Sequence, residues 1–242
     1  MKIASKSDIG RVRSSNQDSF AAGEIYDAAW AVVCDGMGGA NGGNIASGIA
    51  VKTISDCVLS AYHSDMKSNS IIAMLESSIT AANLNVFDEA VDHPELKGMG
   101  TTVVSAIVSK DSAIIAHAGD SRAYLISNGI ISQITRDHSI VQNMVEKGEI
   151  TPDEAKNDPR KHVITRALGV NEDISIEFNE IEFAKGSILL LCTDGLTNFV
   201  SSSEISKIIA ENNIDRAPFA LVDAANAGGG SDNITVVLIS NE

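Results

Sequence analysis

The sequence predicts an α+β protein folded as an α-β-β-α sandwich, with two mainly antiparallel sheets packed between outer helices. Helical periodicity is concentrated before residue 100 and after residue 200, and the residues between are mostly short β-branched strands. Those strands are joined by short turns, which pair neighbours antiparallel rather than through parallel crossovers. No long linker or fixed-period repeat divides the 242 residues. We therefore expect a single domain over residues 1–242.

The first hundred residues predict strands followed by two helices. An apolar run at residues 29–34 predicts a strand that stops at Asp35, and the glycine-rich residues 36–43 predict a loop before the first helix. The second helix is the clearer one, because apolar side chains recur at three and four residues. They form a stripe of Ile72, Leu75, Ile79, Ala82, Val86 and Ala90.

The middle and the end of the chain supply most of the strands. β-Branched residues predict strands at 101–109, 113–117, 122–127 and 130–134. Asn128-Gly129 predicts a type I′ hairpin turn between the last two. Residues 140–160 are polar and predict an exposed excursion. Further strands are expected at 174–183, 187–192 and 233–240, and helices at 204–212 and 218–227.

Charge and composition exclude several classes of protein. Eighteen basic against 32 acidic residues leave a net charge of -14, which opposes binding to the phosphates of a nucleic acid. No segment resembles a signal peptide and no run approaches the roughly 18 apolar residues of a membrane span, so we expect a cytoplasmic protein without membrane contact. Cys34, Cys57 and Cys192 are too widely spaced for a disulfide framework and are expected to be buried free thiols.

Four aspartates stand at the ends of predicted strands: Asp35, Asp120, Asp194 and Asp232. A carboxylate beside a core strand is costly unless a cation or hydrogen bonds compensate it. Oxygen ligands select hard ions, so the four sites predict Mg²⁺ or Mn²⁺ at a shared centre. The competing interpretation is that Asp-Gly is simply a turn dipeptide, which explains one site more easily than four.

The N-terminal segment and the glycine-rich residues offer further candidates. Asp18 is expected to supply another carboxylate, and Arg13 a planar fork suited to phosphate oxygens. Glycine permits close approach, so the Gly36 carbonyl is a candidate metal ligand. A dinucleotide-binding loop is a poor alternative, because Asn41 stands where its third glycine belongs and the setting is antiparallel.

Taken in order along the chain, these motifs resemble the bacterial branch of the PPM (protein phosphatase 2C-like) family. The resemblance rests on Arg13, Asn16-Gln17-Asp18, Asp35-Gly36-Met37-Gly38-Gly39, Gly100-Thr101-Thr102, Gly119-Asp120-Ser121-Arg122, Asp137-His138-Ser139, Thr193-Asp194-Gly195 and Ser231-Asp232-Asn233. It implies a metal-dependent protein serine/threonine phosphatase. It also implies that residues from about 140 to 160 form a mobile flap beside the active site.

The resemblance implies a role for each matching position at the metals. Asp35 would bridge two ions, either Mn²⁺ or Mg²⁺. Asp35 and the phosphate-binding Arg13 would be the catalytic residues. Asp194 and Asp232 would complete the first ion. Asp18 and the Gly36 carbonyl would complete the second.

Bacterial members often hold a third ion, for which Asp120 and Asp194 are the matching positions. The implied mechanism is in-line attack on phosphorus by a metal-activated water, with Arg13 binding the phosphate. We expect no covalent intermediate, because the chain has no Cys-x₅-Arg loop. The leaving alkoxide would take its proton from a metal-bound water or from His138.

Four positions depart from the pattern of relatives: Gln17, Met37, Ala40 and Asn44. None of them removes an expected metal-ligating aspartate. Two alternatives remain at this stage, a catalytically inactive regulatory binding module of the same fold and a metal phosphoesterase for small metabolites. The expected partners of a monomeric phosphatase are phosphorylated proteins, namely the targets of a serine/threonine kinase and the kinase itself.

Overall fold

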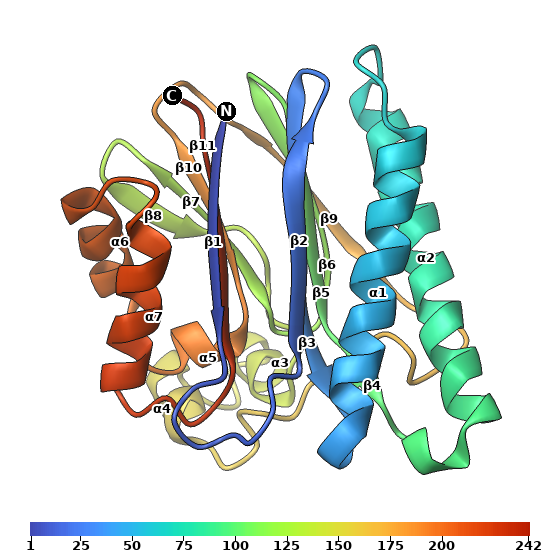
Figure 1. The fold of residues 1–242 in the computed structure, drawn as a ribbon. Helices are drawn as coiled ribbons and strands as arrows, with labels where there is room; N and C mark the ends of the chain where they lie inside the picture. The colour runs from blue at the N-terminus through green and yellow to red at the C-terminus, as the bar shows by residue number, and fades with distance from the viewer.

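The computed structural model describes the backbone of residues 1–242 and the side chains at all positions except 40 and 41, so the departure at Ala40 lies outside the described side chains. Two sheets lie face to face, with helices α1 and α2 outside one and α6 and α7 outside the other (Figure 1). The strand pairings within both sheets are antiparallel. This arrangement confirms the predicted α-β-β-α sandwich.

The first sheet has the strand order β1-β11-β10-β7-β8. Its strands are β1 (Lys2–Asp8), β7 (Arg122–Ser127), β8 (Ile130–Gln133), β10 (Ile188–Cys192) and β11 (Ile234–Ser240). The second sheet has the order β2-β3-β5-β6-β9, and β4 (Gly100–Thr101) pairs with the end of β3. Its strands are β2 (Asp18–Ile25), β3 (Ala28–Met37), β5 (Val103–Val108), β6 (Ser112–Ala118) and β9 (Glu177–Glu182).

The turn chemistry read from the sequence is confirmed at the β7–β8 hairpin. Asn128 and Gly129 both have positive φ angles, 53° and 77°, as a type I′ turn requires. The loop expected over residues 36–43 is wrong in its extent, because β3 continues to Met37 and α1 (Gly39–Ala61) begins two residues later. Strand and helix approach closely there, since a Cβ on Gly36 would collide with the carbonyl oxygen of Gly43.

The helices cover the outer faces of the two sheets. Helices α1 and α2 (Ser68–Asp92) pack against each other, and α6 (Ser202–Glu211) and α7 (Ala217–Ala227) lie on the far side of the sandwich (Figure 1). Within the described chain, α2 is the one helix long and apolar enough to cross a membrane by length and composition. It is nevertheless a core helix, because Leu75, Ile79 and Val86 on its inner face are fully buried.

Three apolar layers hold the sandwich together. One lies between α1, α2 and the second sheet, one between the sheets, and one between the first sheet and α6 and α7. Strands such as β5 and β11 face apolar layers on both sides and are buried along their whole length. This explains why their sequences read as continuous apolar runs rather than as alternating patterns.

The polar excursion carries two short helices, α3 (Ile140–Glu146) and α4 (Pro152–Asn157). Its two ends pair with each other: the Ile140 amide donates to the Val163 carbonyl at 2.9 Å, and an isolated bridge joins Ser139 to Ile164. We call residues 140–163 the flap segment. It closes on itself at one end of the sandwich, next to α5 (Asp194–Thr197).

Candidate active site

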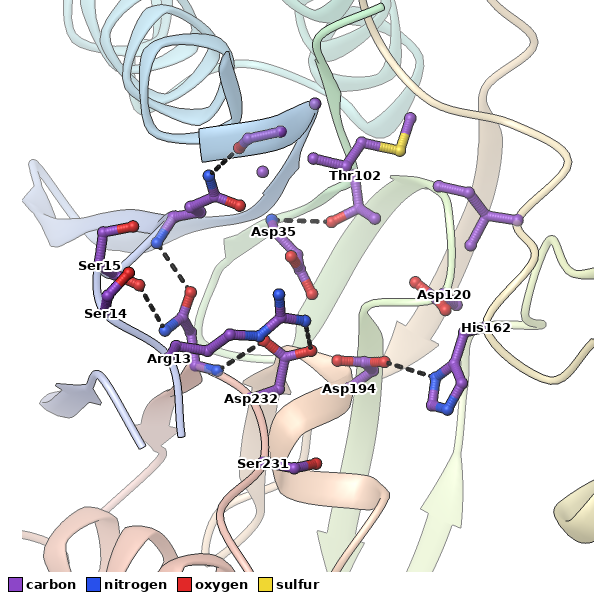
Figure 2. Close-up of a pocket in the computed structure, with 17 residues that line it drawn as sticks. Arg13, Ser14, Ser15, Asp35, Thr102, Asp120, His162, Asp194, Ser231 and Asp232 are labelled. Carbon is purple, nitrogen blue, oxygen red and sulfur yellow. Dashed lines mark hydrogen bonds and ion pairs between the residues drawn. The ribbon is translucent and has the colours of Figure 1, made fainter. Parts of the chain in front are cut away.

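A cavity of about 720 Å³ opens at the end of the sandwich where the two sheets and the flap segment meet. Its lining combines strand ends of both sheets with the N-terminal segment and the base of the flap segment (Figure 2). The charged residues in the lining are Arg13, Asp35, Asp120, His162, Asp194 and Asp232.

The topology explains why carboxylates from distant parts of the chain converge. Asp18 and Asp35 are direct cross-strand partners on β2 and β3 of the second sheet. Asp194 follows β10 and Asp232 precedes β11, and these two strands are antiparallel neighbours in the first sheet. Asp120 lies where the chain crosses from β6 in one sheet to β7 in the other. All five predicted aspartates are thus brought to one end of the sandwich.

Asp18 is buried and ties the two sheets together. Its Oδ2 accepts hydrogen bonds from the Thr235 hydroxyl at 2.7 Å and the Thr193 hydroxyl at 2.9 Å, both from the first sheet side. The Thr193 hydroxyl in turn accepts from the Thr235 amide at 3.0 Å. Sequence reasoning missed these threonines, because no local pattern shows that they face an aspartate some two hundred residues away.

The aspartates raise one another's pKa. Burial, followed by the charges of Asp194 and Asp232, raises the pKa of Asp18 to about 7 against the opposing effect of the two threonine hydroxyls. Burial and the neighbouring aspartates, first among them Asp18, raise the pKa of Asp35 well above its ordinary value. Burial and Asp194 raise the pKa of Asp120 to about 7. The cluster carries unfavourable negative charge that a cation would relieve.

The carboxylate oxygens fit divalent cations. Asp18 Oδ1 and Asp194 Oδ1 are buried and have no hydrogen-bond partner, although the second oxygen of each does. A buried carboxylate oxygen without a donor is costly, and cation binding removes that cost. The Asp35 backbone amide and carbonyl are held by Thr102, which leaves the Asp35 carboxylate free to face the cavity (Figure 2).

Arg13 projects over the aspartates from the N-terminal segment. Its Nη2 donates to Asp232 Oδ2 at 2.7 Å, and this hydrogen bond is the main cause of the raised pKa of Arg13. Asn233 anchors the same segment, because its Nδ2 donates to the Ile9 and Ser15 carbonyls and its Oδ1 accepts from the Gln17 amide. The fork that the sequence predicted is therefore held at the edge of the cavity.

Two further expectations concern the residues around Gly36. Gly36 lines the cavity beside Met37 at the end of β3, as a candidate carbonyl ligand must. Gln17, which departs from the usual acidic residue, also lines it and donates from Nε2 to the Gly39 carbonyl at 2.7 Å. Gln17 thus joins the strand end to the first turn of α1.

His138 does not reach the cavity. The ring is buried, and its Nδ1 accepts from the Gly119 amide at 3.1 Å while Nε2 lies 3.2 Å from Glu177 Oε2. A neutral ring that accepts at Nδ1 carries its proton on Nε2, so Nε2 donates to Glu177. Arg166 Nη1 lies 3.0 Å from the same nitrogen, and its positive charge adds to burial in lowering the pKa of His138 and keeping the ring neutral. The geometry therefore does not support His138 as the proton donor to a leaving group.

Hydrogen bonds also occupy the cluster of His117, His138 and Glu177, whose potential metal-ligand atoms lie within 4.8 Å of one another. His117 stacks on His138 and its Nε2 faces the Arg136 carbonyl at 2.9 Å. Because His138 Nε2 is protonated, it has no lone pair to offer a metal. The cluster instead holds Gly119 and the loop that carries Asp120 through hydrogen bonds.

His162 is the cavity residue that the sequence did not point to. It lies at the base of the flap segment, and its Nδ1 is 3.8 Å from Asp194 Oδ2. Its position depends on the pairing of residues 139 and 164, which is a tertiary feature. A histidine in a polar stretch carries no local signal of that kind.

Comparison with known proteins agrees with the fold. The family model for protein phosphatase 2C matches residues 10–216. The serine/threonine phosphatase stp of Listeria monocytogenes is 36% identical over 239 residues, covering 98% of this chain and 94% of that protein. The crystal structure of serine/threonine phosphatase Stp1 from Staphylococcus aureus matches with a TM-score of 0.93 at 32% identity, covering 100% of this chain and 95% of the other.

A second solved structure bears on the metals. The catalytic domain of the serine threonine protein phosphatase PstP, in complex with 2 manganese ions, matches with a TM-score of 0.86 at 33% identity and covers 98% of this chain and 96% of the other. The stacked antiparallel sheets, the named relatives and these solved structures together identify a metal-dependent serine/threonine phosphatase. The chain belongs to the protein phosphatase 2C family.

Proposed function

We propose that this phosphatase removes phosphate from phosphoserine and phosphothreonine residues of proteins by direct attack of a water activated by divalent cations. The observation that carries the proposal is the meeting of four aspartates, Asp35, Asp120, Asp194 and Asp232, at one cavity, with Asp18 buried beside Asp35 on the neighbouring strand. Buried oxygens of Asp18 and Asp194 lack any hydrogen-bond donor. Phosphorylated targets of a serine/threonine kinase are the substrates that this activity implies.

The aspartates divide into ligand sets according to their place in the sheets. Asp35 would contribute to two cation sites, with Asp194 and Asp232 completing the first and Asp18 with the Gly36 carbonyl completing the second. The cross-strand pairing of Asp18 with Asp35 and the neighbouring strands of Asp194 and Asp232 support this division. When bound, Mn²⁺ or Mg²⁺ supplies the chemistry that lowers the pKa of a water and neutralises charge on phosphoryl oxygens.

Arg13 binds and orients the phosphate. Its guanidinium is held by Asp232 at 2.7 Å and still presents further N–H donors toward the cavity (Figure 2). Arg13 and His162 lie on opposite sides of the aspartates, so a phosphate seated between them faces the carboxylate cluster (Figure 2). The net charge of -14 makes this local positive group more important for an anionic substrate.

A thiol nucleophile is a poor alternative to water. Cys34 and Cys192 are fully buried in strands β3 and β10. Burial raises the pKa of Cys192 to about 12 and raises that of Cys34 further, so neither presents a thiolate. We therefore propose that no covalent phosphoenzyme forms.

The test is hydrolysis of phosphoserine and phosphothreonine peptides by purified protein with Mn²⁺ or Mg²⁺, in parallel with sugar phosphates and nucleotides. We expect release of phosphate from the peptides, loss of it with chelator, and a loss of at least a thousandfold in Asp35→Asn and Asp194→Asn. Asp65→Asn is the matched control, because Asp65 is exposed beyond the far end of α1.

Each competing outcome has its own meaning. Hydrolysis of small metabolites in preference to peptides would identify a phosphoesterase of another substrate class. Binding of phosphopeptides without turnover under any divalent ion would identify the inactive regulatory module. Full activity of Asp35→Asn would remove the proposed bridging role.

A further inference from the structure

Arg13 lies in a loop that has no regular secondary structure of its own. Residues 9–17 join the end of β1 to the start of β2, and we call them the Arg13 loop. The Arg13 side chain is 52% exposed, so packing alone does not fix it. A group that binds a reacting phosphate must be held to within roughly half an ångström of its productive position. The contacts that hold this loop therefore determine where the guanidinium meets a phosphate.

Asn233 closes the Arg13 loop from the opposite end of the chain. Its Nδ2 donates to the Ile9 carbonyl at 2.9 Å and to the Ser15 carbonyl at 3.0 Å. Its Oδ1 accepts from the Gln17 amide at 2.8 Å. Both ends of the loop are thus bonded to one side chain, which is itself only 5% exposed. Because both ends are fixed, the residues between them lose much of their conformational freedom.

The hydrogen bonds of Asn233 leave it no direct part in binding substrate. The two carbonyl contacts use both N–H donors of its side-chain amide. Although Asn233 lines the cavity, it therefore has no side-chain donor left for a phosphate oxygen. Any effect of this side chain on phosphate binding must pass through the backbone that it holds.

The residue before Asn233 holds the guanidinium itself. Asp232 Oδ2 accepts from Arg13 Nη2 at 2.7 Å, and Asp232 Oδ1 accepts from the Asn233 backbone amide at 2.8 Å (Figure 2). The Arg11 amide also donates to the Gly230 carbonyl at 2.7 Å. Consecutive residues at the start of β11 thus fix both the backbone of the loop and the side chain that it presents.

Asp18, the first residue after the loop, has supports that do not depend on Asn233. Its carboxylate accepts from the Thr193 and Thr235 hydroxyls, and its backbone pairs with β3. The residues around Arg13 belong to no strand. Loss of the Asn233 side chain is therefore expected to displace the guanidinium much more than the carboxylates.

We propose that Asn233 is a positioning residue for phosphate binding, which closes the Arg13 loop and so sets the guanidinium over the aspartates. The proposal rests on the role of Arg13 in the proposed function and adds a residue through which that role is achieved. A purely structural asparagine would change stability alone. Loss of Asn233 should instead weaken the binding of phosphate more than the binding of cations.

Asn83 on α2 provides a control with the same set of hydrogen bonds. Its Nδ2 donates to the carbonyls of Asn171 at 2.9 Å and Glu172 at 2.7 Å, and its Oδ1 accepts from the Gly169 amide at 2.8 Å. Asn83 is fully buried, and these four residues lie outside the cavity lining. Asn83→Ala therefore removes two carbonyl contacts and one amide contact without touching the Arg13 loop.

Gly10→Ala offers a second way to displace the loop, which leaves the Asn233 side chain in place. Gly10 has a positive φ of 81°, and a Cβ there would collide with the Asp232 carbonyl oxygen. Alanine at this position must shift the start of the loop. This variant keeps the inference testable even if Asn233→Ala does not fold.

The experiment places each variant in a double-mutant cycle with Arg13→Ala, at saturating Mn²⁺. The measured quantities are kcat and KM for a phosphopeptide and the inhibition constant of inorganic phosphate, which reports binding without turnover. We expect Asn233→Ala and Gly10→Ala each to lower kcat/KM and to weaken phosphate binding by at least about tenfold. In the Arg13→Ala background, the same substitutions should cost less than about threefold.

Two further measurements separate positioning from stability. Calorimetry should show Mn²⁺ affinity within roughly threefold of the wild type in Asn233→Ala, because the substitution removes no ligand atom. Urea denaturation should show that Asn83→Ala and Asn233→Ala lose similar stability, since they lose similar hydrogen bonds. Asn83→Ala should nevertheless keep kcat/KM and phosphate affinity near the wild-type values.

The outcomes distinguish this inference from the proposed function. Equal losses with and without Arg13, or a loss of phosphate affinity in Asn83→Ala as large as in Asn233→Ala, would overturn the positioning role. Weakening of Mn²⁺ as large as the weakening of phosphate would overturn it too. If Arg13→Ala itself leaves kcat/KM and phosphate affinity unchanged, the phosphate-binding role in the proposed function is wrong, and this inference falls with it.

Discussion

Asp18 on β2 and Thr235 on β11 are joined by a hydrogen bond of 2.7 Å that crosses from one sheet to the other. The Thr235 hydroxyl is also 2.8 Å from the Ser7 hydroxyl on β1, which completes a chain of polar contacts under the cavity. A proposed metal ligand therefore also connects the two halves of the sandwich. Stability and metal affinity should consequently respond to the same substitutions.

Thr235→Val is expected to weaken both properties at once. The substitution keeps the side-chain volume but removes a buried donor to Asp18, so we expect a loss of about 2 kcal/mol in the free energy of unfolding. The loss of that donor also raises the pKa of Asp18 further and reduces affinity for Mn²⁺. Urea denaturation and calorimetry measure the two effects. Thr80→Val, at an exposed position of α2, should change neither; equal losses there would contradict the cross-sheet interpretation.

Arg13→Ala is expected to lower kcat/KM for a phosphopeptide by roughly a hundredfold to a thousandfold, because it removes donors to the phosphoryl oxygens. Mn²⁺ affinity should stay within a few fold of the wild type, since Arg13 contributes no ligand atom. Arg11→Ala, two residues earlier on the same exposed segment, serves as the control. Comparable losses in both variants would assign the effect to general electrostatics rather than to the Arg13 fork.

Removal of the cations should destabilise the protein more at pH 8 than at pH 5.5. The pKa values of Asp18 and Asp120 are raised to about 7 in the fold, so the folded state favours their protonated forms. Without cations, stability is retained below the ordinary pKa of these groups and is lost as the pH rises through about 7. At pH 8 we expect Mn²⁺ to raise Tm by roughly 5 °C or more over chelator, and less at pH 5.5.

Thermal scans at both pH values measure this difference. Asp35→Asn should reduce it, because the variant removes the central negative charge of the cluster. A larger Mn²⁺ effect at pH 5.5 than at pH 8 would contradict the raised carboxylate pKa values.

Titration of His138 should make the free energy of unfolding depend on pH in the direction opposite to that of Asp18 and Asp120. Burial is the main cause that lowers its pKa to about 4, against the hydrogen bond to Glu177, and His117 and Arg166 lower it further. The unfolded chain therefore takes up a proton before the folded one does. The stability linked to His138 is complete above about 6.5 and is lost as the pH falls toward 4, with a magnitude on the order of 3 kcal/mol.

His138→Asn tests this contribution, because the amide oxygen can still accept from the Gly119 amide but does not titrate. The free energy of unfolding, measured by urea between pH 4.5 and 7.5, should depend less on pH in the variant than in the wild type. Parallel curves for the two proteins would show that His138 is not the group responsible.

Gly36→Ala and Gly48→Ala should change stability in opposite directions. A Cβ at Gly36 would collide with the Gly43 carbonyl oxygen and lie 2.6 Å from the Gln17 carbonyl oxygen, so we expect a loss of about 3 kcal/mol and weakened Mn²⁺ binding. At Gly48, inside α1, a Cβ meets no atom within 4 Å, and alanine should stabilise the helix by about 0.5–1 kcal/mol. Urea denaturation of the pair is the measurement; equal tolerance at both positions would contradict the close packing of β3 on α1.

Much of the fold could be read from the sequence because its strands are apolar runs with clear ends. The predicted strand at residues 122–127 coincides with β7, and the Asn128-Gly129 turn has the expected backbone angles. What the sequence could not show is which strands share a sheet. β6 and β7 are consecutive and separated by a short connection, yet they lie in different sheets, because the chain changes layer at Gly119 and Asp120.

The sequence predicted those residues of the candidate site that lie at the ends of apolar strands. Asp35, Asp194 and Asp232 stand beside core strands, where an unpaired carboxylate is conspicuous. Thr235 lies near the start of an apolar strand and His162 in a polar stretch, so no local sequence pattern distinguishes either residue. Their roles arise only from cross-sheet contact and from closure of the flap segment, which are properties of the assembled structure.

The division of the aspartates between the layers has a consequence for fragments of this chain. A break in the flap segment would leave Asp18, Asp35 and Asp120 on the N-terminal piece and Asp194 and Asp232 on the C-terminal piece. The first sheet would also be divided, because β1 and β7 come from one piece and β10 and β11 from the other. Neither piece alone could hydrolyse a phosphoester, and recovered turnover on mixing them would report directly on their reassembly.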